Sequence, residues 1–297
     1  MPPARRAETL LHHDRFPSRH VFDTAVSHAM LRRVAGGASP NSLRLYRPDN
    51  VMLFSSLDAR RPGYARAVEL AAAAGFGSVI RLAGGHAAAF LEESMAFAWA
   101  TRDPDARNHI RARFERLAGL VVEALRRLGL DARVGEVPGA YCPGEFSVNI
   151  AGRVKIMGVG QRVIHGGAHV GGVLTVGHSE LLRATLLGVY DALALEFRPE
   201  TAGGIGDFDS GISVEDVVES MQQAFEAEGV TLCPERFDDA TLEAAKALLP
   251  MHHALARGSV RGESLRSIEG KTLLLADRLA SRDGRTQLDK ESTKSRT

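Results

Sequence analysis

Short strands in hairpin-like pairs stand between separate amphipathic helices along this chain, without a regular strand–helix–strand alternation. The segments 43–46 and 51–54 flank Arg47-Pro-Asp-Asn50, which predicts a hairpin. The segments 146–150 and 154–157 are joined by a short turn and predict a second hairpin. This arrangement predicts an α+β fold in which a mixed, largely antiparallel sheet is packed with helices. Further strands are expected over 79–82 and 170–176.

Apolar residues recur at helical spacing in several separate segments. The clearest stripe, from Ile110 to Leu128, belongs to the core, and we assign it no functional role. The last helix is expected to begin after Ser213 as its N-cap, with Asp216 completing a capping box. The expected helices cover 21–35, 64–74, 110–128, 179–195 and 213–228.

The composition is that of a globular chain that can bury a full core: 297 residues, 44% hydrophobic and 25% charged. A formal net charge of +1 argues against nucleic acid or a membrane surface as a partner. No segment reaches the roughly 18 apolar residues of a membrane span, and the residues up to His20 lack the apolar centre of a secretory signal. Cys142 and Cys233 give no disulfide framework, so we expect a cytoplasmic protein.

Lysine is nearly absent from this chain, and its one early occurrence is informative. Of the 37 basic residues only 5 are lysines, and Lys155 is the single lysine before Lys246. Codon bias explains an excess of arginine on the surface, but it does not explain the exception. A position that keeps lysine is expected to need a compact charge on a flexible stem, able to turn its donors onto one oxygen. Lys155 is therefore a candidate functional residue.

Two glycine-containing elements could carry chemistry. In Arg81-Leu-Ala-Gly-Gly-His-Ala-Ala-Ala-Phe90, Gly84 and Gly85 would let backbone N–H groups approach a phosphate or carboxylate, and Arg81 could add donors. An ordinary turn is the alternative interpretation, because the element is neither a P-loop nor a dinucleotide fingerprint.

The second element is the hairpin that contains Lys155. Strand alternation is expected to place Lys155 with Met157 on one face, and Val154 with Ile156 on the other. Gly158 follows and permits close backbone approach. A solvated hairpin face is the alternative interpretation of this pattern.

Together and in this order, the two elements resemble those of the biotin/lipoate protein ligase catalytic family, in particular its lipoate–protein ligase A and octanoyltransferase-like branch. The family has an Arg-x-Ser-Gly-Gly-Gly-Ala-Val element followed by a Gly-Arg-Lys-Ile-x-Gly-x-Ala-Gln hairpin. Here they read Arg81-Leu-Ala-Gly-Gly-His-Ala-Ala and Gly152-Arg-Val-Lys-Ile-Met-Gly-Val-Gly-Gln161. The resemblance extends over about 20–230.

The resemblance implies attachment of a lipoyl or octanoyl group to a lysine of a lipoyl-domain acceptor protein, by way of an acyl-adenylate. ATP and lipoate or octanoate would be substrates, Mg²⁺ could accompany ATP, and no tightly bound cofactor is expected. A separate accessory chain could complete the site. Lys155 would hold the acyl carbonyl and phosphate oxygens. The acyl- and nucleotide-binding residues it implies are Arg81, Gly84, Gly85, His86, Ala87, Ala88, Ala89, Gly158 and Gln161.

Departures from the family pattern leave the use of ATP open. Ala83 replaces a serine or threonine, His86 replaces a glycine, Phe90-Leu91 replace a His-Asp pair, and Val154 is an extra residue before the lysine. Two alternatives to the ligase therefore remain. One is a transferase that works without ATP, and the other is a catalytically degenerate lipoyl-binding protein.

Cys142 distinguishes the two enzymatic hypotheses. It lies in the loop Gly139-Ala-Tyr-Cys-Pro-Gly144, thirteen residues before Lys155, and not on an apolar stripe. Cysteine-dependent octanoyltransferases of this fold are similar in placing their nucleophile in the loop before this strand. A buried, inert cysteine is the alternative.

The order of these features predicts how the chain is divided. We expect an N-terminal extension over 1–20, a catalytic domain over 21–230, a short helical appendage over 231–280 and a disordered tail over 281–297, where the composition cannot support a core. No histidine spacing fits a metal site.

Overall fold

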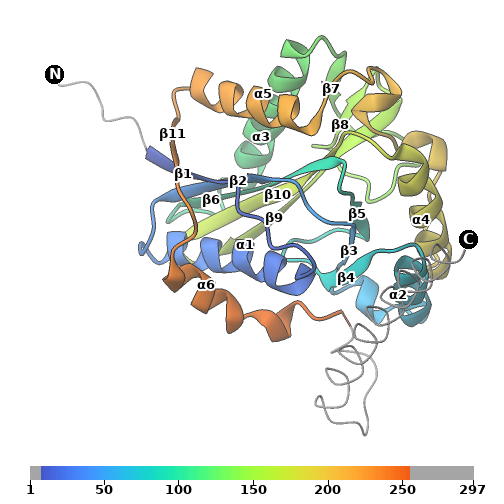
Figure 1. The fold of residues 1–297 in the computed structure, drawn as a ribbon, viewed down its shortest axis with the longest axis horizontal. Coiled ribbons are helices and arrows are strands. Elements are labelled where there is room, and N and C mark those ends of the chain that lie inside the picture. The colour runs from blue at the N-terminus through green and yellow to red at the C-terminus, as the bar shows by residue number, and fades with distance from the viewer. Residues whose placement is uncertain (1–7, 255–297) are drawn as a thin grey trace, which may run out of the picture. The chain divides into compact units, whose positions relative to one another are not determined.

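Residues 8–254, which the computed structural model describes, form two β-sheets and six α-helices (Figure 1). The larger sheet has eight strands in the order β11-β1-β2-β6-β10-β9-β8-β7. β1 runs parallel to both of its neighbours, and the other pairs are antiparallel. Its strands are β1 (Glu8–His12), β2 (Asn41–Tyr46), β6 (Ser94–Arg102), β7 (Ala132–Val134), β8 (Val148–Ile150), β9 (Val154–Ile164), β10 (Gly167–Thr175) and β11 (Thr231–Pro234).

The smaller sheet has three strands in the order β4-β3-β5. β3 (Val51–Phe54) runs parallel to β4 (Gly77–Ile80) and antiparallel to β5 (Ala88–Phe90). Two mixed sheets of this kind, largely antiparallel and covered by helices, confirm the α+β fold predicted from the sequence.

The helices cover the two sheets in three groups (Figure 1). α1 (His20–Ala35) and α6 (Asp239–Lys246) pack together on one face of the large sheet, while α3 (Ile110–Arg127) and α5 (Val214–Ala227) pack on the other. α2 (Tyr64–Ala73) and α4 (Ser179–Ala192) share a core with the small sheet. The bounds of α1 to α5 confirm the helices predicted from hydrophobic spacing, within three residues at every end.

The capping box predicted for α5 is present. The Asp216 amide donates to Ser213 Oγ at 3.1 Å, and the Ser213 amide donates to the Asp216 carboxylate at 2.8 Å. Each bond satisfies a backbone donor that the first helical turn leaves without a partner.

The hairpin predicted over 43–54 is wrong, because its two strands belong to different sheets. β2 is buried along its length and pairs with β1 and β6, whereas β3 pairs with β4 and β5. The side chain of Asn50 accepts a hydrogen bond from the Glu92 amide at 3.0 Å, which ties this crossover to the chain just before β6. A strand buried on both edges needs partners on both sides, and a two-stranded hairpin cannot supply them.

The hairpin predicted over 146–157 is present and contains a β-bulge. Asn149 pairs with Lys155 and Val148 pairs with Met157, so one extra residue stands on the β9 side. Lys155 consequently lines a pocket, whereas Met157 packs into the hydrophobic core. The predicted shared face of Lys155 and Met157 is therefore wrong, because a bulge shifts the alternation by one residue.

The segments expected to flank the central domain each contribute a strand to the large sheet. β1 lies within 1–20 and β11 begins the segment 231–280, and the two pair in parallel. Residues 255–280 of the expected appendage and the expected tail 281–297 lie outside the described residues. Over the described range, no helix combines the length and apolar character needed to cross a membrane.

Candidate active site

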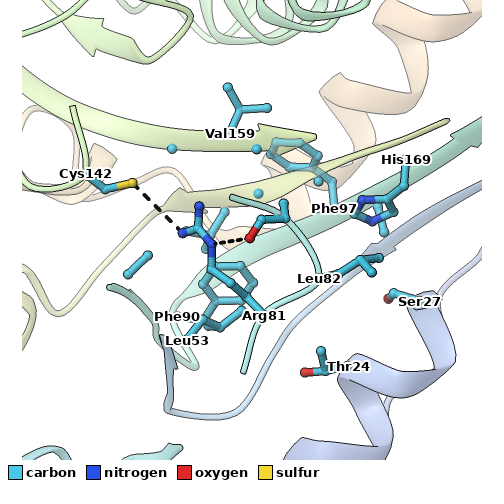
Figure 2. A pocket seen from close by; sticks show the side chains of 18 of the residues that line it. Thr24, Ser27, Leu53, Arg81, Leu82, Phe90, Phe97, Cys142, Val159 and His169 are labelled. Atoms are coloured by element: carbon cyan, nitrogen blue, oxygen red, sulfur yellow. Dashed lines mark hydrogen bonds between the residues drawn. The ribbon is translucent and has the colours of Figure 1, made fainter. Parts of the chain in front are cut away.

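A pocket lies between the two sheets, beside α1 (Figure 2). It encloses about 750 Å³, including the part open to solvent. Its wall is mainly apolar, with a few polar groups, which is the usual character of a small-ligand site. The apolar side chains come from both sheets and the loop after β4, and they are Leu53, Leu82, Phe90, Phe97, Val159 and Val173.

Glycines on β9 and β10 keep the floor of this pocket open. A Cβ at Gly172 would lie 2.0 Å from the Gly158 carbonyl oxygen and 2.9 Å from the Phe97 ring. At Gly160, a Cβ would lie 2.9 Å from that of Ala83. No larger residue fits at these positions, so β9 and β10 present bare backbone to this part of the apolar pocket.

Cys142 lies at one side of the pocket, and its half-buried sulfur faces two donors. The His86 amide donates to Sγ at 3.2 Å. Arg81 Nη1 lies 4.0 Å from the sulfur (Figure 2). Cys142 adopts a left-handed backbone conformation, with φ of 40°. Its own amide donates to the hydroxyl of Tyr190 at 2.7 Å. Donors directed at a sulfur stabilise the thiolate, which is its nucleophilic form.

Lys155 is 1% exposed and holds the main chain that carries this cysteine. Its Nζ donates to the carbonyl oxygens of Tyr141 at 3.0 Å and Cys142 at 2.7 Å, and it lies 4.7 Å from the centre of the Tyr141 ring. Burial lowers the pKa of Lys155 to about 8, and the charge of Arg81 acts in the same direction. The lysine singled out by composition thus lies directly beneath the candidate nucleophile.

The loop that begins at Arg81 folds around its own guanidinium group. Arg81 donates to the carbonyl oxygens of Ala83 at 3.1 Å and His86 at 2.9 Å. Gly85 has a φ of 102°, and a Cβ there would lie 2.3 Å from Arg81 Nη2 and 2.8 Å from Cys142 Sγ. Glycine is required here because any side chain would collide with both groups.

Most of the other residues expected at the site lie around this loop, and one does not. Ala88 and Gly158 line the pocket, Ala87 and Ala89 are buried beside it, and the Gly84 carbonyl faces Gly160. Gln161 lies elsewhere: its side chain accepts from Arg113 at 2.8 Å and donates to the Ile110 carbonyl at 3.1 Å, at the start of α3.

Sequence reasoning missed three residues of the site. The fully buried carboxylate of Asp58 lies 3.0 Å from His86 Nδ1. The Tyr190 hydroxyl, which accepts from Cys142, donates to the Ala87 carbonyl at 2.9 Å. His169 lines the pocket at 5% exposure, and neither of its ring nitrogens has a hydrogen-bond partner among the described residues. Burial lowers the pKa of His169 to about 4.

Of these three residues, only Asp58 had a signal in the sequence, which was the histidine within the glycine element. Its partner Asp58 comes from a different loop, so no local pattern could have identified the pair. Within residues 8–254, no group of three His, Cys, Asp or Glu side chains is arranged to hold a metal ion.

Comparison with known sequences gives a family and several relatives. The family described as "Lipoyl protein ligase A/B catalytic domain" matches residues 20–226. An octanoyl-GcvH:protein N-octanoyltransferase of Geobacillus kaustophilus is 28% identical over 169 residues, 55% of this chain and 57% of that protein. One of Bacillus velezensis is 27% identical over 214 residues, 66% of this chain and 74% of that protein. The match thus spans less than two thirds of the Geobacillus relative's length.

Solved structures share the fold. The crystal structure of a lipoate-protein ligase A bound with ATP aligns with a TM-score of 0.68 and 21% identity, over 82% of this chain and 94% of that one. A bipartite lipoate protein ligase from Thermoplasma acidophilum aligns with a TM-score of 0.67 and 21% identity, over 88% of this chain and 100% of that one. At this identity the likeness establishes the fold expected from the sequence.

Proposed function

Because this chain belongs to the lipoyl protein ligase A/B catalytic domain family, we propose that it transfers an octanoyl or lipoyl group to a lysine of a lipoyl-domain protein through a thioester on Cys142. One observation carries this proposal. The Cys142 sulfur lies at the wall of an apolar pocket, within 3.2 Å of a backbone N–H and 4.0 Å from a guanidinium nitrogen.

The pocket and its polar edge suggest how the reaction proceeds. The acyl chain lies between β9, β10 and the small sheet, with its carbonyl carbon beside Cys142. The sulfur attacks that carbon, a C–S bond forms, the C–N bond to the donor lysine breaks, and the thiol proton passes to the departing amine. The acceptor nitrogen then attacks the thioester, a C–N bond forms, and the sulfur leaves. The His86 amide and Arg81 stabilise negative charge on the sulfur in both halves.

Lys155 acts through the main chain. By holding the carbonyl oxygens of Tyr141 and Cys142, it keeps the nucleophile loop in the conformation that turns the sulfur towards its donors. Its ammonium group also adds positive charge near the reacting carbonyl. Such preorganised charge is a large part of acyl-transfer catalysis.

The relatives' name supports the choice of partners. By that name, the Geobacillus and Bacillus proteins transfer an octanoyl group from octanoyl-GcvH to a protein nitrogen. We therefore assign octanoylated GcvH as the donor and a lipoyl-domain protein as the acceptor. The reducing cytoplasm suits a reaction that needs a free thiol.

The experiment compares two ways of supplying the acyl group. In one sample, the enzyme and an unmodified lipoyl domain receive octanoylated GcvH without ATP. In the other they receive octanoate or lipoate with ATP and Mg²⁺. The intact mass of the lipoyl domain is measured over time. We expect acylation in the first sample only.

Cys142→Ser should abolish this transfer, while Cys233→Ser, which alters the other cysteine on β11, should leave it unchanged. Acylation only with free acid and ATP, and in full with Cys142→Ser, would instead establish the adenylate-forming ligase. Tight binding of lipoyl groups without turnover in either sample would establish the non-catalytic alternative.

A further inference from the structure

Asp58 and His86 form a buried carboxylate–imidazole pair beside the candidate nucleophile. Asp58 is 0% exposed; one carboxylate oxygen accepts the Ser55 amide at 2.8 Å, and the other lies 3.0 Å from His86 Nδ1. Because a carboxylate only accepts hydrogen bonds, Nδ1 carries a proton, and Nε2 is the nitrogen through which the ring can take up or release a second one. This is how an orienting carboxylate prepares a histidine to accept a proton.

The main chain of His86 contacts the candidate nucleophile, and its side chain is reachable from solvent. Its amide lies 3.2 Å from Cys142 Sγ, while its side chain is 31% exposed. Two other titratable bases line the pocket, and both are buried: Lys155 is 1% exposed with its Nζ donating to two carbonyl oxygens, and His169 is 5% exposed. An arginine side chain cannot be deprotonated in proteins, so it does not act as a base. His86 is therefore the base that an incoming protein substrate can meet.

The second half-reaction needs such a base. An acceptor lysine arrives as an ammonium ion, which has no lone pair, so it must lose one proton before it can attack. If the pair only stabilised the loop, an exposed histidine ring would not be needed, because any buried hydrogen-bond donor could satisfy the Asp58 carboxylate.

Resting on the proposed function, we infer that His86 is the general base for the acceptor lysine and that Asp58 positions it. Nε2 of His86 takes one proton from the ammonium group, and the neutral amine attacks the thioester carbon. The C–N bond forms, the C–S bond breaks, and the second nitrogen proton passes to the departing sulfur. The imidazolium ion then returns its proton to solvent. Asp58 holds the ring in the required tautomer and stabilises its charge.

The test isolates this half-reaction. The full chain is first acylated on Cys142 with a small octanoyl thioester, octanoyl-N-acetylcysteamine, so that loading needs no departing amine. The adduct is then chased at pH 7 with either a lipoyl domain or hydroxylamine. Hydroxylamine is already neutral at this pH and needs no base. Loss of the octanoyl mass is followed for both nucleophiles.

For His86→Asn, which keeps a donor towards Asp58, we expect transfer to the lipoyl domain to fall about 10²–10⁴-fold. Release by hydroxylamine should change less than about twofold, and added imidazole should restore part of the transfer. Asp58→Asn should also slow transfer more than release. His109→Asn is the control, because His109 Nδ1 lies 2.9 Å from the Asp103 carboxylate in a comparable but exposed pair. This variant should change neither rate.

Each contrary result has a distinct meaning. Wild-type transfer by His86→Asn would overturn the inference and leave the proposed function intact. Equal slowing with both nucleophiles would assign the pair a structural role and also overturn the inference. A wild-type chain that forms no Cys142 adduct would contradict the proposed function and this inference together.

Discussion

The two loops of the site, which carry Arg81 and Cys142, can approach each other closely because residue 85 is a glycine. A Cβ at this position would collide with both Arg81 and Cys142, whereas a Cβ at Gly84 would meet nothing within 4 Å. We predict that Gly85→Ala lowers the rate of Cys142 acylation at least about tenfold with a modest loss of stability, and that Gly84→Ala changes neither. Acylation rates and thermal melting measure this difference. Equal behaviour of the two variants would contradict the assigned contact.

Burial of the charged ammonium group of Lys155 lowers the stability of the folded protein. Its pKa of about 8, against an ordinary 10.5, corresponds to roughly 3 kcal/mol. Below pH 8 both the folded and unfolded chains are protonated, and the full cost is present. Between these pKa values the unfolded chain binds a proton that the folded chain does not, so wild-type stability rises with pH.

We therefore predict that Lys155→Met abolishes most transfer activity and loses this pH dependence, while it leaves the carbonyl oxygens of Tyr141 and Cys142 without their donor. As the pH rises from 8 towards 10, the unfolding urea concentration of wild type should rise relative to that of the variant. Urea titrations of both proteins at several pH values test this. A difference that is independent of pH would mean that the lysine is not buried as a cation.

The sequence identified the residues whose chemistry stands out locally. Lys155 is an exception to the arginine bias, Cys142 lies in a loop before a strand, and Arg81 opens the glycine element. Asp58 and Tyr190 could not be identified, because their partners come from distant segments. An aspartate in a polar loop and a tyrosine on an amphipathic helix have no local pattern that distinguishes them from ordinary surface and core residues.

At the scale of elements, α4 joins the two loops that form the site. The Tyr190 hydroxyl accepts from the Cys142 amide and donates to the Ala87 carbonyl, and Tyr190 is buried. Burial is the main cause that raises the pKa of Tyr190 well above its ordinary value. The hydroxyl therefore remains a neutral bridge throughout the physiological range.

Tyr190→Phe should cost about 1–3 kcal/mol, because it leaves a buried amide and a buried carbonyl without partners. We also expect slower acylation of Cys142, since the loops are no longer tied. Tyr141→Phe is the matched control: the Tyr141 hydroxyl is buried without a partner among the described residues, so its removal should be neutral or stabilising. Denaturant unfolding of both variants would show the contrast, and equal losses would contradict it.

The strands that were missed or paired wrongly in the sequence prediction have one cause in common. Helices have a period of their own and were predicted closely, whereas strand partners depend on distant segments. β6 was missed because it alternates large with small side chains instead of apolar with polar. Met95, Phe97 and Trp99 face the α3–α5 side, while Ala98 and Ala100 let α1 approach. The hairpin over 43–54 was predicted wrongly for the same reason, because its two strands pair with distant strands and not with each other.

Across residues 8–254, buried neutral histidines link distant parts of the chain. His28 on α1 donates to His252 at 3.0 Å, and His252 donates in turn to the Ile80 carbonyl at 2.7 Å, at the end of β4. His169 is buried in the pocket wall. Burial is the main cause that lowers the pKa of His28 to about 3, that of His169 to about 4, and that of His252 below its ordinary value.

These histidines predict instability in acid. Below pH 6.5 the unfolded chain binds protons that the folded chain does not, so stability falls as the pH falls. Each such histidine contributes about 1.4 kcal/mol per pH unit. His169→Phe should therefore flatten the loss of unfolding free energy between pH 6.5 and pH 4.5, measured by urea titration. An unchanged slope would mean that His169 binds its proton in the folded state.

The thioester on Cys142 is the central claim, and mass spectrometry detects it directly. Wild-type protein is incubated with octanoylated GcvH in the absence of ATP and of any acceptor, and its intact mass and peptide map are recorded. We predict one added octanoyl group on the peptide that contains Cys142, removed by hydroxylamine and passed to a lipoyl domain when one is added. Acylation of the lipoyl domain at the wild-type rate by Cys142→Ser, with no adduct on the wild-type chain, would contradict the account.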